Sequence, residues 1–137
     1  MSAGQSRLLL PRVIGALSLS QRTFAVVAAD GSAGVQAGLI VVLAGIVEGS
    51  VVSSVHGETT LDTGQLVYSV VAALIGWVVW GGVVYAVSTR IFDHPAELRP
   101  VLRAVAFTHA PALVYGLALI PGLTTWAGLL LLLSLLW

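Results

Sequence analysis

Two ionisable side chains, Glu48 and His109, lie within long apolar stretches of the sequence. A carboxylate inside a membrane span is energetically costly and is therefore a candidate functional group. Glu48 could bind a proton or an ion as a functional site, serve a structural role, or reach the membrane surface. We expect the structural role, in which the carboxyl group is protonated or hydrogen-bonded to a neighbouring helix. His109 could ligate a metal or the magnesium of a chlorophyll-type pigment, since neutral imidazole is a common ligand. We instead expect it to satisfy backbone groups beside Pro111, which lacks an N–H donor.

Helical geometry argues against pairing between these two groups. If their helices begin at Gly34 and Val101 on the same side of a membrane, Glu48 lies about 21 Å deep. His109 then lies about 9 Å closer to that surface, because each residue adds about 1.5 Å. We therefore treat Glu48 and His109 as separate intramembrane polar candidates.

Other patterns give little support for catalysis. His56, Glu58 and Asp62 share one short stretch, but three polar side chains in a loop are weak grounds for a metal site. The chain has no Cys, which excludes disulfides and thiolate metal sites. It contains no HExxH, GxGxxG or P-loop motif and no Ser-His-Asp order. We expect a protein that is not an enzyme and that holds no metal or cofactor, although bound lipid is expected.

Composition predicts an integral membrane protein. Of the 137 residues, 58% are hydrophobic and only 9% are charged, whereas soluble domains carry about 25% charged residues. So few charges cannot cover a water-soluble surface, and lipid must solvate much of the chain. The formal net charge is zero, so nucleic acid is not an expected partner. The expected partners are other integral membrane proteins and membrane lipids.

The apolar stretches predict an all-α, polytopic bundle of about four membrane-spanning helices, which makes residues 1–137 one membrane domain. About 20 residues are needed to cross a hydrocarbon core of about 30 Å. The predicted spans are 34–55, 65–88, 101–120 and 124–137. The last reaches only about 21 Å at 1.5 Å per residue, so we expect the natural chain to continue beyond Trp137.

Amphipathic segments are predicted at the membrane surface. Residues 1–30 have apolar side chains interspersed with arginines, and Ser20 is a suitable N-cap for a short helix ending at Ala28. A second amphipathic helix is predicted over 95–106, between spans two and three, with Pro95 at its first position. Both segments are expected to lie in the headgroup region.

The arginines predict the orientation of the chain. Arg7, Arg12 and Arg22 precede the first span, and no Arg lies in the connection 56–64. The next group, Arg90, Arg99 and Arg103, follows span two. Because basic residues mark the cytoplasmic side, the pattern places the N-terminus in the cytoplasm. The second group could also bind anionic lipid headgroups; service as ordinary topology determinants is the alternative.

Small residues predict close helix packing. In span one, Gly34, Gly38, Gly45 and Gly49 fall within about 60° of one another on a helical projection. Such a stripe allows a second helix to approach closely. In span two, Gly76 closes a similar face that begins at Ser69. We expect these faces to meet each other or a partner protein.

Several of these features together resemble the bacterial Ypt-interacting-protein (Yip) domain family of multi-pass membrane proteins. The residues that carry the resemblance are Gly76-Trp77-Val78-Val79-Trp80-Gly81 with Tyr85 and Arg90, then Phe107-Thr108-His109-Ala110-Pro111, and Ile120-Pro121-Gly122. The resemblance covers nearly the whole chain and implies a location in the bacterial cytoplasmic membrane. Members typically have about five spans, whereas this sequence stops within its fourth. The resemblance implies no catalytic activity.

Two functions are compatible with the sequence. The favoured one is a non-enzymatic scaffold or accessory subunit that packs against other membrane proteins and lipids, for which a respiratory or photosynthetic assembly is one setting. The alternative is a small ion- or solute-coupled transporter that uses Glu48. Transporters usually have internal repeats and a polar pathway. This sequence has no convincing repeat, and only Glu48 and His109 carry a carboxyl or imidazole group within the predicted spans.

Overall fold

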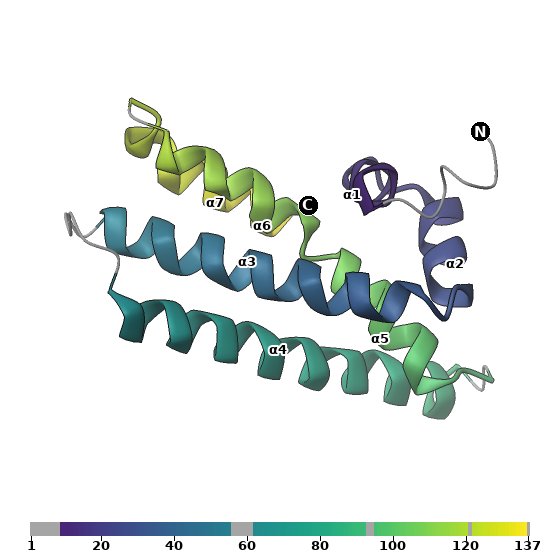
Figure 1. Ribbon diagram of the computed structural model, residues 1–137. Coiled ribbons are helices and arrows are strands. Elements are labelled where there is room, and N and C mark those ends of the chain that lie inside the picture. The colour runs from purple at the N-terminus through teal and green to yellow at the C-terminus, as the bar shows by residue number, and fades with distance from the viewer. Residues whose placement is uncertain (1–8, 56–61, 93–94, 121, 137) are drawn as a thin grey trace.

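A computed structural model describes residues 9–55, 62–92, 95–120 and 122–136. The regular secondary structure within these ranges is helical (Figure 1), which confirms the predicted all-α class. The elements in chain order are α1 (Leu9–Leu17), α2 (Gln21–Ala29), α3 (Ala33–Val55), α4 (Thr63–Arg90), α5 (Leu98–Phe107), α6 (Ala110–Tyr115), the 3₁₀ turns η2 (Gly116–Leu119) and η3 (Thr124–Trp126), and α7 (Ala127–Leu136).

Three segments are long and apolar enough to cross a membrane: Ala33–Ser54, Thr63–Arg90 and Leu98–Leu119. The structure therefore supports a membrane protein with several candidate spans. Among the described residues, the fourth predicted span contains only the ten-residue helix α7 after the turn η3. Ten helical residues extend about 15 Å, which is half of a hydrocarbon core. A fourth crossing is thus not shown.

Helices α3 and α4 run side by side along the length of the molecule (Figure 1). No proline interrupts either helix, and Glu48 is the only charged side chain in them before Arg90 at the end of α4. Asp62 caps α4, because its carboxylate accepts hydrogen bonds from the backbone N–H groups of Gly64 at 3.0 Å and Gln65 at 3.3 Å. Arg90 in the last turn complements the negative end of the helix dipole.

The third long segment is broken rather than continuous. Helix α5 ends at Phe107, residues 108–109 form a turn, and α6 begins at Ala110 with Pro111 in its first turn. A proline there is tolerated because first-turn N–H groups have no intrahelical acceptor.

The start of α5 differs from the prediction, which placed Pro95 at the first position of the amphipathic helix. The helix instead begins at Leu98, with Glu97 as its N-cap residue. The reason is Pro100. A helix that began at Pro95 would place Pro100 in its interior, where the ring clashes with the carbonyl four residues earlier. A start at Leu98 puts Pro100 in the first turn, where no hydrogen bond is lost.

Helix α3 lies between α4 and α6, and α7 packs against α6 (Figure 1). At the other end of α3, helix α5 packs against α2, α3 and α4. The main buried cluster forms where these helices converge with α1; Ile40 and Val41 of α3 and Phe107 of α5 are its largest fully buried members together with Val27 of α2. The short N-terminal helices are therefore part of the packed structure rather than a separate tail.

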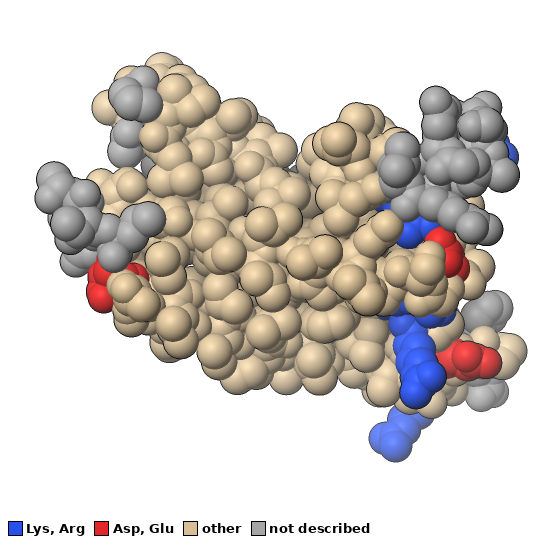
Figure 2. All heavy atoms as spheres, viewed as in Figure 1, with Lys and Arg blue, Asp and Glu red and all other residues tan. Residues whose placement is uncertain are grey.

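On the face shown in Figure 2, charged side chains lie at the two ends of the molecule and not along its middle. Figure 2 shows the arginines of the visible face gathered at one end, near α2 and the start of α5, with a broad uncharged band along α3 and α4. A small acidic group marks the other end, where α4 begins at the Asp62 cap. This distribution suits a chain whose centre lies in hydrocarbon and whose ends lie in water or among headgroups.

Candidate functional site

The glycines of α3 divide into two groups. Gly45 and Gly49 are buried against α4: a Cβ atom on Gly45 would lie 2.8 Å from the Cα of Val70 and 3.1 Å from the carbonyl oxygen of Ser69. A Cβ atom on Gly49 would lie 3.0 Å from the hydroxyl oxygen of Ser69. These two positions therefore allow α3 and α4 to approach more closely than any larger residue would permit.

The other glycines of the predicted packing faces are open. A Cβ atom on Gly34, Gly38 or Gly76 would meet no atom within 4 Å. Gly34 and Gly76 are exposed, whereas Gly38 is half-buried. The structure thus places Gly45 and Gly49 of α3 against Ser69 of α4, and it leaves Gly76 on an uncovered surface.

Glu48 is half-buried on the side of α3 opposite the exposed residues Leu39 and Leu43. Its carboxyl group interacts electrostatically with His109 and with Tyr115, which both come from the third long segment. The sequence argument against such proximity started that segment at Val101. Because α5 begins three residues before Val101 and α3 begins one residue before Gly34, the expected difference in depth shrinks to about 6 Å. We call Glu48, His109 and Tyr115 the intramembrane polar cluster.

His109 lies in the turn between α5 and α6. Its Nδ1 atom is 3.4 Å from the carbonyl oxygen of Val105, which can only accept a hydrogen bond. This contact favours the tautomer with the proton on Nδ1 and leaves the lone pair on Nε2. The hydroxyl of Thr108 donates to the same carbonyl at 2.7 Å. A carboxyl, an imidazole and a phenol in one cluster can hold or exchange a proton.

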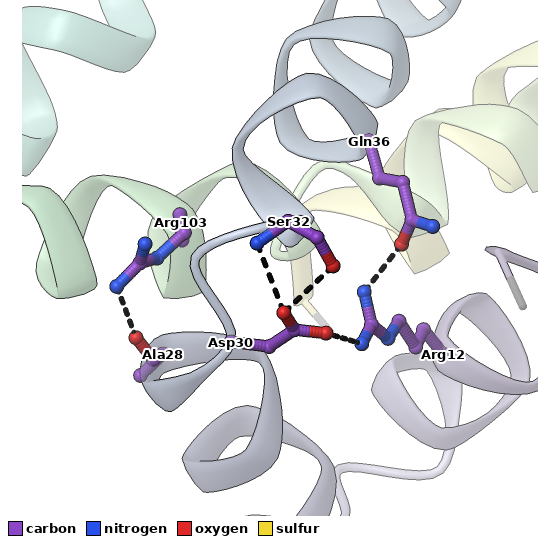
Figure 3. A network of polar contacts seen from close by, with 6 residues as sticks. All are labelled: Arg12, Ala28, Asp30, Ser32, Gln36 and Arg103. Carbon is purple, nitrogen blue, oxygen red and sulfur yellow. Dashed lines mark hydrogen bonds and ion pairs between the residues drawn. The ribbon is translucent and has the colours of Figure 1, made fainter. Parts of the chain in front are cut away.

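The arginine-rich end contains a polar network that sequence reasoning did not identify (Figure 3). Arg12 of α1 is only 3% exposed; it forms an ion pair with Asp30 and donates a hydrogen bond to the side-chain oxygen of Gln36 at 2.5 Å. Asp30 also accepts hydrogen bonds from the backbone N–H of Ser32 at 2.9 Å and from its hydroxyl at 2.7 Å. We call Arg12, Asp30, Ser32 and Gln36 the N-terminal clasp.

The clasp fixes the charge of Asp30. Hydrogen bonds from Ser32, together with the Arg12 guanidinium, hold the pKa of Asp30 well below its usual range. The carboxylate is therefore ionised at neutral pH and links three elements: Arg12 comes from α1, Asp30 follows α2, and Gln36 lies in the first turn of α3. The signals in the sequence were an arginine within an apolar segment, one acid (Asp30) before the first span and one amide (Gln36) near the start of that span.

The arginines that were predicted to contact lipid headgroups also divide into two groups. Arg103 faces inward, where its Nη2 atom donates to the carbonyl oxygen of Ala28 near the end of α2 at 2.5 Å, while its Nε atom is buried without a hydrogen-bond partner (Figure 3). Arg90 and Arg99 are exposed. Arg103 thus joins α5 to α2, whereas Arg90 and Arg99 are exposed to a ligand outside the chain.

Helices α4 and α5 are also joined by a side-chain hydrogen bond. The indole N–H of Trp77 donates to the carbonyl oxygen of Leu102 at 2.8 Å. The side chain of Leu102 also fills the space beside Gly81, where a Cβ atom would collide with it. Trp77 therefore has a hydrogen-bonding role in addition to its packing against the main buried cluster.

His56, Glu58 and Asp62 share one short stretch of the sequence and are weak candidates for a metal site. His56 and Glu58 lie outside the described residues, and Asp62 serves as the cap of α4. Within the described ranges, no group of three or more His, Cys, Asp or Glu side chains is placed to hold a metal ion. Comparisons of the chain with protein-family models, curated proteins and solved structures found no match.

Proposed function

We propose that this chain is a non-enzymatic membrane scaffold or accessory subunit, which uses the uncovered face of α4 to pack against other integral membrane proteins. In this proposal it lies in the bacterial cytoplasmic membrane with its N-terminus in the cytoplasm. It has four crossings, the last of which includes α7, and it belongs to the Yip-like proteins that its glycine, tryptophan and proline patterns resemble. A respiratory or photosynthetic assembly is one setting that would supply suitable partners.

The observation that carries this proposal is the surface of α4. One side of the helix packs against α3 and α5, and the other side remains exposed over several turns. The large exposed residues of this face are Val67, Tyr68, Val71, Ile75, Val78, Val79, Trp80 and Val83. Exposed apolar surface that is continuous over a whole helix marks a contact with lipid or with another protein.

The shape of the face favours a helix over lipid alone. Ala72 and Gly76 are both exposed, one turn apart, and the space beside Gly76 is open. Small residues at this spacing let a second helix approach the backbone, which is how helices associate in a bilayer. The neighbouring Trp80 is 58% exposed and offers a large aromatic contact on the same surface.

The proposal is tested by recovery of partners from membranes of the native host in mild detergent. We expect the tagged chain to be recovered in fixed stoichiometry with a larger complex. Substitution Gly76→Leu should release the partner without lowering the chain's own stability, because nothing lies within 4 Å of that position. Gly34→Leu, at an equally open position on α3, is the matched control and should retain the partner.

The intramembrane polar cluster supports the alternative function, an ion-coupled transporter. Glu48 is the residue that would bind the coupled proton or cation, and His109 and Tyr115 are close enough to interact with it electrostatically. A homogeneous oligomer of this chain alone that moves an ion, and that loses this activity on Glu48→Gln substitution, would defeat the scaffold proposal. Retention of ion movement in the Glu48→Gln variant would exclude the cluster as the coupling site.

A further inference from the structure

Where α4 ends and α5 begins, two exposed arginines, Arg90 and Arg99, stand beside exposed apolar side chains. Arg90 is the last residue of α4, and it is followed directly by Ile91 and Phe92, which are 71% and 72% exposed. Arg99 lies in the first turn of α5 next to Leu98, which is also exposed. We call Arg90, Ile91, Phe92, Leu98 and Arg99 the α4–α5 end surface.

These guanidinium groups differ from those of Arg12 and Arg103. The latter two are bonded to Asp30 and Ala28 and hold the N-terminal helices in place. Neither Arg90 nor Arg99 takes part in a hydrogen bond or ion pair with the described residues. A guanidinium at the end of an apolar helix carries five N–H donors that must find acceptors in water or in headgroups.

The arrangement matches the boundary between lipid headgroups and acyl chains. Large apolar side chains at the end of a spanning helix insert below the headgroups, while arginine stems extend so that the charged groups reach the phosphate level. The planar guanidinium donates two parallel hydrogen bonds to a phosphate group. We propose that Arg90 and Arg99 bind the phosphate groups of bilayer phospholipids, with Ile91, Phe92 and Leu98 inserted beneath them.

Nearby acids make phosphate, rather than net charge, the recognised feature. Glu97 is exposed at the start of α5, and the sequence places Asp93 between the two arginines. Two carboxylates offset the two positive charges, so attraction to an anionic surface is weak at long range. Hydrogen bonding to the phosphate group is common to zwitterionic and anionic phospholipids, and both classes should bind. The inference requires membrane embedding but does not depend on the proposed partner of α4.

Solid-state NMR can test the contact directly because the chain contains only six guanidinium carbons, one for each arginine. The chain is labelled with ¹³C at the arginine guanidinium carbon and reconstituted into phospholipid vesicles in phosphate-free buffer, so that lipid supplies the only ³¹P. The wild-type spectrum minus that of the Arg90→Lys, Arg99→Lys double variant isolates two carbons. We expect ³¹P recoupling to attenuate this difference signal, and we expect no attenuation of the difference obtained with Arg103→Lys.

The outcomes separate the proposal from its competitors. If the Arg90 and Arg99 difference signal is not attenuated, or if the Arg103 signal is attenuated equally, the assignment is overturned. The indole N–H signal of Trp77 must match that of the wild type in each variant, which shows that the contact between α4 and α5 is intact. Attenuation in phosphorus-free glycolipid bilayers with added inorganic phosphate would also overturn the proposal, because it would assign the site to the free anion.

Discussion

Substitution of Gly45 by alanine should push α3 and α4 apart. The new Cβ atom would lie 2.8 Å from the Cα of Val70, 3.1 Å from the Ser69 carbonyl oxygen and 3.2 Å from the Ala73 Cβ. Two of these three atoms belong to the backbone of a long helix, which cannot move aside locally. Extra atoms forced into a packed contact typically cost about 1–3 kcal/mol of unfolding free energy.

The matched control is Gly38→Ala in the same helix, where nothing lies within 4 Å of the added atom. Both substitutions gain the same helix propensity, which amounts to about 1 kcal/mol in water. That gain cancels in the difference between the two variants. We therefore expect Gly45→Ala to be about 1–3 kcal/mol less stable than Gly38→Ala. Gly49→Ala should fall between them, because two of its three closest neighbours, the Ser69 hydroxyl oxygen and the Leu66 Cδ2, can rotate away, whereas the Ser69 Cβ cannot.

Unfolding in mixed micelles of mild and denaturing detergent, followed by tryptophan fluorescence, measures these differences. Two of the four tryptophans, Trp77 and Trp80, lie in α4, so part of the fluorescence change reports on that helix. Equal midpoints for Gly45→Ala and Gly38→Ala would refute the close approach of α3 and α4 at this position. A Gly38→Ala variant less stable than Gly45→Ala would show that the wrong half of the glycine stripe has been assigned to the contact.

Three further predictions concern the polar contacts. Trp77→Phe should lose about 1 kcal/mol of stability in the same micelle assay, because the hydrogen bond to the Leu102 carbonyl is removed; an unchanged midpoint would contradict that bond. Arg12→Gln should increase hydrogen exchange in α1 and α2 while α4 stays protected, since the clasp holds the N-terminal helices against the start of α3 and contains no residue of α4; uniform exchange in all helices would contradict this local role. The folded-state pKa of Asp30 lies below its unfolded value, so its stabilisation should persist from neutral pH to about pH 5 and be lost only as the pH falls below about 4. Protection of α1 and α2 measured against pH should follow this course in the wild type and become flat in Asp30→Asn.

The two longest helices could be predicted from the sequence because their apolar residues are uninterrupted. Predicted spans 34–55 and 65–88 correspond to α3 and α4, and each helix extends the predicted range by only one or two residues at its ends. Length and composition are local properties, so no tertiary information is required. The third segment was harder to predict, because two prolines compete for the first turn of α5 and only Pro100 decides where the helix begins.

Contacts between residues that are distant in the sequence could not be predicted from composition and length. The ion pair between Arg12 and Asp30 depends on how α1 folds back over the start of α3, which no periodic pattern records. The inward direction of Arg103 depends likewise on the position of α2 beside α5. The spacing of the α3 glycines indicated a packing face, but it did not reveal that α4 covers Gly45 and leaves Gly34 uncovered.

The sidedness of a cysteine-free chain tests the central claim most directly. Single cysteines are introduced by Arg22→Cys, Arg99→Cys and Thr63→Cys, at exposed positions in α2, in α5 and at the start of α4, and are labelled in sealed vesicles with a membrane-impermeant thiol reagent. If α3 and α4 cross the bilayer, positions 22 and 99 react from one side and position 63 reacts from the other. Reaction of positions 22 and 99 from opposite sides, or of all three from the same side, would contradict the membrane arrangement.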